Sequence, residues 1–238
     1  MVPKSTMFKR FLLAGLFIFS LVGGATVAQA TVALPLAAWD TYGQPGDQTA
    51  TPGVGSENVD ALDMVRGAGL DPSAASNSFS SKGWDGTDAN DYIEFGFSVA
   101  AGYQANLDEL WIGTRSSSTG PGTMGVYTSL DGFSNPIYTI TQCDTAYSNS
   151  IISLNGLEGV VGDFYIRLME IGNTQADGSG DTYSGGTFRV VDHYDSGIYT
   201  DTSIFGSVEP IAAVPVPAAV WLFGSGLLGL VGIHRRKQ

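Results

Sequence analysis

The sequence predicts an all-β fold, a single β-sandwich set between two terminal segments of different composition. Glycine accounts for 32 of 238 residues, whereas Asp, Glu, Lys and Arg together make up only 14%. This balance favours strands joined by turns over surface helices rich in Glu and Lys. Strand-like runs recur through the middle of the chain, and no convincing helical pattern interrupts them. Many short strands without helices are typical of a sandwich.

Nine segments carry strand signals. The runs at 92–99 and 164–169 alternate between apolar residues and small or polar ones, as expected when only one face packs on a partner sheet. The Gly-rich segments 118–122, 131–133 and 177–180 supply the backbone conformations that tight turns need. The predicted domain spans 31–209, and its strands span 36–41, 61–66, 91–99, 107–115, 124–129, 137–142, 150–154, 164–171 and 187–191.

The first 30 residues have the three parts of a secretory signal peptide. Lys9 and Arg10 form the charged start, residues 11–22 form the apolar run, and Ala28 and Ala30 place small side chains at the cleavage point. We therefore expect signal peptidase to cut after Ala30. An N-terminal membrane anchor is the alternative, but it would need about 20 apolar residues.

The C-terminal end predicts a linker at 210–217, a transmembrane helix at 218–233 and a basic cytoplasmic tail at 234–238. The 16 uncharged residues of the helix would extend about 24 Å, slightly less than the hydrocarbon core of a bilayer. A buried core helix is the alternative, which the basic stop at the last residues disfavours. The predicted anchor residues are Trp221, at the outer interface, and Arg235, Arg236 and Lys237, on the cytoplasmic side.

Residues 214–237 resemble the PEP-CTERM sorting signal of exopolysaccharide-producing Gram-negative bacteria, which combines a proline motif, a short apolar helix and a terminal Arg-rich cluster. The motif here is Val214, Pro215, Val216 and Pro217, with Val216 in place of the family's usual glutamate. The resemblance implies recognition in the inner membrane by an exosortase, a membrane cysteine protease, and cleavage near the prolines. It also implies transfer to the cell surface or extracellular matrix. A tail that is retained uncut is the alternative that Val216 leaves open.

Three further motifs resemble a surface module that recurs ahead of such tails. The strand at 86–95 reads Gly-Thr-Asp-Ala-Asn-Asp-Tyr-Ile-Glu-Phe, and the turn at 129–133 reads Ser-Leu-Asp-Gly-Phe. The strand at 186–190 reads Gly-Thr-Phe-Arg-Val. This resemblance implies a jelly-roll-like sandwich of carbohydrate-binding type and specifies no ligand.

The predicted domain is strongly acidic, which limits the classes of molecule that it can bind. Three of the 11 basic residues fall in the signal peptide and three in the tail, so five remain against 23 acidic residues. Nucleic-acid binding depends on Lys and Arg displacing counterions, so nucleic acid is excluded as a partner. Contact with the membrane is expected through the C-terminal helix.

Cysteine and histidine usage excludes several kinds of site. Cys143 is the only cysteine, so no internal disulfide can form, and we expect it to be buried, as free cysteines mostly are. His193 and His234 are the only histidines, too few for a zinc hydrolase. No Gly-x-Ser-x-Gly or phosphate-loop motif occurs. The domain is therefore not expected to be an enzyme.

Calcium is the one cofactor that the acidic residues suggest, because Ca²⁺ takes several carboxylate and carbonyl oxygens, often on loops. Asp85, Asp88 and Asp91 recur every three residues ahead of a predicted strand and form the first candidate site. Asp192 and Asp195 form the second. Solvated acidic loops are the commoner explanation, and no EF-hand pattern is present.

Aromatic residues in or beside predicted loops suggest a sugar-binding face, with ordinary packing at the ends of the sandwich as the alternative. These residues are Trp39, Trp84, Tyr103, Tyr147, Tyr183, Tyr194 and Tyr199. We expect an exported surface or matrix protein with a structural or glycan-associated role, in contact with extracellular polysaccharide. A secreted polysaccharide hydrolase, which would need two convergent carboxylates, is one alternative. A single-span membrane protein with an unprocessed tail is the other.

Overall fold

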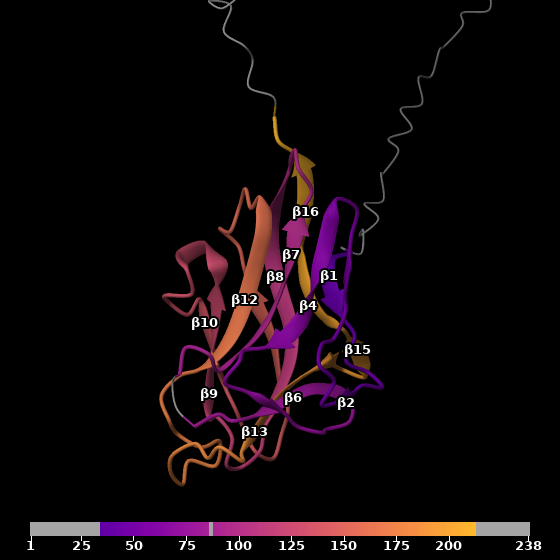
Figure 1. Cartoon of the computed structure of the whole chain (residues 1–238). Coiled ribbons are helices and arrows are strands. Elements are labelled where there is room, and N and C mark those ends of the chain that lie inside the picture. The colour runs from indigo at the N-terminus through magenta and orange to yellow at the C-terminus, as the bar shows by residue number, and fades with distance from the viewer. Residues whose placement is uncertain (1–33, 86–87, 213–238) are drawn as a thin grey trace, which may run out of the picture. The chain divides into compact units, whose positions relative to one another are not determined.

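The computed structural model describes residues 34–85 and 88–212, and this part of the chain is all-β (Figure 1). The predicted signal peptide (1–30), sorting motif (214–217), transmembrane helix (218–233) and basic tail (234–238) lie outside the described residues. Within the described ranges, no helix has the length and apolar character needed to cross a membrane.

The strands form two main sheets and one small hairpin. The larger sheet contains β1 (Pro35–Trp39), β2 (Pro45–Gly46), β3 (Gly53–Gly55), β5 (Asp71–Pro72), β6 (Ser78–Lys82), β8 (Tyr103–Ser116), β11 (Ser148–Ser153), β13 (Thr187–Val191) and β16 (Thr202–Pro210). The smaller sheet contains β4 (Val59–Arg66), β7 (Tyr92–Val99), β9 (Thr123–Thr128), β10 (Tyr138–Thr141) and β12 (Gly162–Glu170). The hairpin consists of β14 (His193–Asp195) and β15 (Ile198–Thr200), and a single 3₁₀ turn, η1 (Ser129–Asp131), follows β9.

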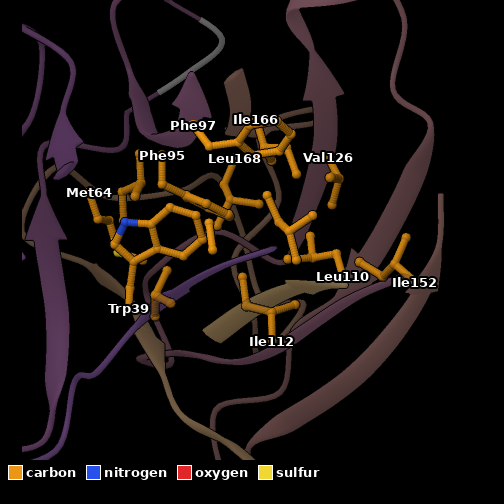
Figure 2. Close-up of a cluster of buried hydrophobic side chains, with 14 of the residues drawn as sticks. Trp39, Met64, Phe95, Phe97, Leu110, Ile112, Val126, Ile152, Ile166 and Leu168 are labelled. Atoms are coloured by element: carbon orange, nitrogen blue, oxygen red, sulfur yellow. The ribbon is translucent and has the colours of Figure 1, made fainter. Parts of the chain in front are cut away.

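One hydrophobic core joins the inner faces of the two sheets, which curl into a half-barrel. In β12, Phe164, Ile166 and Leu168 are buried while the residues between them are partly exposed, so the predicted alternation is confirmed. Figure 2 shows Ile166 and Leu168 facing side chains of the opposite sheet, among them Leu110 and Ile112. Trp39 of β1 lies edge-on to Phe95 of β7, with ring centroids 4.9 Å apart. The core therefore depends on contacts between distant parts of the sequence.

All nine predicted strands are present, to within four residues at each end, as β1, β4, β7 to β13. The principal strand that the sequence analysis missed is β16, which Gly206 interrupts and Pro210 ends. β16 pairs with β8 over most of its length, with a bulge between Phe205 and Gly206. The polar strand β6, Ser-Phe-Ser-Ser-Lys, was also missed because it lacks an apolar alternation.

The long strand β8 organises the larger sheet. Leu110 pairs with β11 on one edge and with β16 on the other, and Thr114 pairs with β11 and with β13. β16 and β13 therefore lie end to end along the same edge of β8. Between them the chain leaves the sheet as the β14–β15 hairpin and returns, so the hairpin is an insertion into an otherwise continuous antiparallel pairing.

Candidate functional site

A cavity of about 400 Å³ lies beside the β14–β15 hairpin. It collects residues from the turn after β1, the segment before β6, the start of β11 and the hairpin itself. Four of its lining residues are tyrosines, and most of the others are polar. The lining residues are Tyr42, Ser76, Asn77, Tyr147, Asn149, Val191, Asp192, Tyr194 and Tyr199.

The four tyrosines are unusually exposed for aromatic residues of a folded domain. Tyr42 is 73% exposed, Tyr199 71%, Tyr147 49% and Tyr194 43%. The rings of Tyr194 and Tyr199 lie across the hairpin from each other with centroids 4.8 Å apart. Exposed aromatic rings grouped around a cavity mark a candidate binding surface.

Local hydrogen bonds fix the backbone at two of these tyrosines, Tyr42 and Tyr194. The backbone N–H of Tyr42 donates to Oδ1 of Asp40 at 2.8 Å, which fixes the turn after β1. The backbone N–H of Tyr194 donates to Oδ1 of Asn149 at 2.8 Å, which ties the hairpin to β11. Rigid presentation lowers the entropy that ordering the aromatic groups would otherwise cost on binding.

Three carboxylates gather at the base of the hairpin. Asp40, Asp192 and Asp201 each offer an oxygen, and these oxygens lie within 4.8 Å of one another. Trp39 of β1 pairs with Thr202 of β16. Asp40 and Asp201 are the next residues beyond this pair and are therefore neighbours. Asp192 directly follows β13, at the other end of the inserted hairpin.

The Asp192 carboxyl group is 9% exposed, and burial raises its pKa. The hydroxyl and backbone N–H of Thr41 donate to its Oδ1 at 2.7 and 3.0 Å and oppose this rise, whereas the nearby Asp40 charge adds to it. Chemically, the group can accept hydrogen bonds from sugar hydroxyls, contribute to binding a cation, or donate a proton.

The structure brings together some of the predicted aromatic residues and buries others. Tyr147, Tyr194 and Tyr199 line the same cavity. Tyr42 also lines it, although it was not among the sequence-predicted aromatic residues. Trp39 and Trp84 are fully buried, so for these two residues the alternative of ordinary packing holds and a sugar-binding role does not. Trp39 packs between the sheets, and Trp84 packs edge-on against a core phenylalanine. Tyr103 packs against the core, and Tyr183 is exposed but does not line the cavity.

The first calcium candidate lies at the entrance to β7, where Asp85 and Asp88 are exposed and Asp91 is buried. Burial, with the charges of Asp88 and Asp85 added, raises the pKa of Asp91 to about 6. Burial, with a further contribution from the charges of Asp91 and Asp85, raises the pKa of Glu170 of β12 to about 7; this residue was not among the sequence-predicted site residues. The calcium site at Asp85, Asp88 and Asp91 stays a prediction.

The second calcium candidate and the lone cysteine are placed differently from expectation. Asp192 gathers with Asp40 and Asp201, whereas Asp195 lies outside that cluster of carboxylates. Cys143 is exposed, so the expectation of a buried thiol was wrong. It lies in the connection between β10 and β11, where its sulfur contacts the Thr145 hydroxyl at 3.1 Å, and this contact is the main cause that lowers its pKa.

The chain was compared with known proteins. No protein-family model matches it, and no curated protein does.

Proposed function

We propose that this chain is an exported surface or extracellular-matrix protein whose domain binds a glycan in the tyrosine-lined cavity. One observation carries the binding role: four exposed tyrosines surround a cavity of about 400 Å³ that also presents amide, hydroxyl and carboxylate groups. Stacked aromatic rings suit the apolar faces of pyranoses, and the polar groups suit their hydroxyls.

The exported location rests on the two ends of the chain. A signal peptide cut after Ala30 would deliver the domain across the inner membrane, and the Val214–Pro217 motif would present it to an exosortase. The curled pair of sheets is in keeping with a jelly-roll-like sandwich, the finer fold that we propose for the domain. A matrix protein with an exposed glycan site would associate with the polysaccharide around it.

The glycan role is tested with the full chain, purified in detergent, and neutral oligosaccharides. Tyr194→Ala is expected to weaken binding about tenfold, because one stacking ring is lost. Tyr183→Ala is the matched control, since Tyr183 is 62% exposed but does not line the cavity. Equal affinities for the wild type and Tyr194→Ala, measured by calorimetry, would contradict the proposed site.

Sorting is tested by intact-mass analysis of the protein from envelope and culture medium. A species that begins at Thr31 and ends near Pro217 is the expected result. A species that begins at Thr31 and still ends at Gln238 would show an anchor that is never removed. That outcome would refute exosortase processing and leave the glycan role intact.

A polysaccharide hydrolase is the second candidate, and the convergence of Asp40, Asp192 and Asp201 within 4.8 Å favours it. Retaining glycosidases hold their two carboxyl groups about 5 to 5.5 Å apart. The test is the release of new reducing ends from polysaccharide by the full chain and by Asp192→Asn. Release that disappears in the variant would establish hydrolysis, whereas binding without release would leave the domain as a binding module.

A further inference from the structure

A second cavity, of about 380 Å³, contains two of the few basic residues of the domain. Arg115 of β8 and Arg189 of β13 lie directly opposite each other, and Arg189 lies opposite Ser80 of β6. Directly opposed residues in antiparallel strands point to the same face of a sheet. Ser80, Arg189 and Arg115 therefore form one row across three strands, and all three line this cavity.

Placing two like charges opposite each other in a sheet is unfavourable unless something compensates for it. Among residues 34–85 and 88–212, no carboxylate lies within 4.0 Å of either guanidinium, and the ion pair that is present there joins Arg167 to Glu94. Arg66 differs from this pair because its guanidinium donates to three backbone carbonyls, those of Ser80, Gln48 and Gly46. An acidic domain thus keeps two adjacent arginines without a carboxylate partner.

The surroundings of the two arginines are suited to a small anionic group. Arg115 uses one N–H on the backbone carbonyl of Asp144, at 3.0 Å, and its remaining donors have no partner in the described part of the chain. Ser80 also lines the cavity and is 1% exposed, and its buried hydroxyl has no hydrogen-bond partner among the described residues. A buried hydroxyl without a partner is costly, so a ligand atom that accepts a hydrogen bond from it would be favoured.

The cavity adjoins the tyrosine-lined one through Tyr147. The guanidinium carbons of Arg115 and Arg189 lie 5.0 and 5.6 Å from the centroid of the Tyr147 ring. Tyr147 also lines the first cavity, so its ring separates an aromatic binding surface from a cationic one. A single oligosaccharide could contact both.

We propose that the Arg115–Arg189 cavity binds the carboxylate of an acidic sugar, with the neighbouring residues of the same polysaccharide against the tyrosines. This inference rests on the proposed glycan role and adds its substrate class, a polysaccharide that contains uronic acids. A planar guanidinium pairs with a carboxylate through two parallel N–H bonds, which gives both strength and orientation. The net negative charge of the domain acts over longer range and is screened beyond about 8 Å at physiological ionic strength.

The test uses the full chain in detergent with a chelator present, so that no calcium bridges acidic groups. The probes are a galacturonic acid trimer, its uncharged methyl ester and inorganic sulfate. We expect the wild type to bind the acidic trimer at least tenfold more tightly than the ester. Arg189→Gln should abolish this difference, whereas Lys82→Gln, which removes an exposed cation outside the cavity, should preserve it.

The outcomes separate this inference from the proposed function. Equal affinities for the acidic trimer and its ester would overturn the carboxylate site, as would a preference for the acid that survives in Arg189→Gln. In either case, loss of ester binding in Tyr194→Ala would still support the glycan role. Sulfate binding that depends on Arg189 without binding of the trimer would also overturn it, as a site for free anions only. Without ligand, Arg189→Gln is expected to unfold at or above the wild-type temperature, because the substitution removes a like-charge pair. An unfolding temperature far below that of the wild type would indicate a structural role for Arg189 and contradict the inference.

Discussion

Glu170 and Asp91 are two acidic residues in the interior of the domain, 5% and 4% exposed. Each lies one position beyond the last pair between β12 and β7, which joins Met169 to Tyr92. The Thr182 hydroxyl donates to one carboxyl oxygen of Glu170, and the other oxygen is buried without a partner among the described residues. Burial of this kind disfavours the ionised form of the carboxyl group relative to its stability in water.

The magnitude follows from the pKa of Glu170, which burial raises from 4.5 to about 7 with a further contribution from Asp91 and Asp85. The folded state then binds this proton more tightly than the unfolded state, so the contribution to stability is fully present below pH 4.5. It is lost as the pH rises through about 7. At about 1.4 kcal/mol per tenfold change in proton affinity, the loss amounts to up to about 3 kcal/mol.

The variant Glu170→Gln resembles the protonated acid in shape and cannot ionise. We expect it to match the wild type at pH 4.5 and to exceed its free energy of unfolding by up to about 3 kcal/mol at pH 8, as measured by urea denaturation. Glu158→Gln is the control, because Glu158 is exposed and its replacement should leave the pH profile unchanged. Parallel pH profiles for the wild type and Glu170→Gln would refute the reasoning.

Three further predictions concern packing and charge, and each is checked by urea denaturation. Gly96→Ala should destabilise the domain by about 1 to 3 kcal/mol, because a Cβ there would lie 2.0 Å from a carbonyl oxygen of the neighbouring strand, whereas Gly180→Ala, with nothing within 4 Å, should be neutral. Trp39→Ala should cost about 3 to 5 kcal/mol, since the fully buried indole leaves a cavity between the sheets; a smaller loss would mean that the sheets close over the gap. Arg167→Met should cost about 2 kcal/mol by leaving the half-buried Glu94 without its partner at 2.6 Å, and adding Glu94→Gln should restore part of that loss.

The strands were predictable because their signal is local. In β7 and β12, apolar residues alternate with polar ones over eight or nine positions, and the sequence alone shows that period. β16 escaped because a glycine and a bulge break its alternation at Phe205 and Gly206, yet pairing with β8 stabilises it in the folded domain. The strand thus depends on a neighbour about 100 positions earlier in the sequence.

The candidate site was less predictable for the same reason. Tyr42 and Asp40 lie about 150 positions before the hairpin that they meet, and no spacing rule connects them. The sequence drew attention to Tyr194 and Tyr199 but equally to Trp39 and Trp84, since proximity to a turn does not reveal which rings an opposite sheet will cover. The sequence therefore indicated that aromatic residues form the binding surface, and the fold determines which of them are exposed there.

Because the β14–β15 hairpin is an insertion, mutations in it can change ligand preference without changing the strand pairing of the larger sheet. β13 and β16 keep their places along β8 through their own pairing, and the Thr202 hydroxyl bonds to the Val191 carbonyl across the gap at 3.3 Å. The segment between them can lengthen, shorten or change composition without shifting the register of the sheet. Two of the four cavity tyrosines lie on that segment. Asp192 and His193 of that segment are buried, so it is the exposed residues 194–199 that can change ligand preference while the pairing of the sheet is kept.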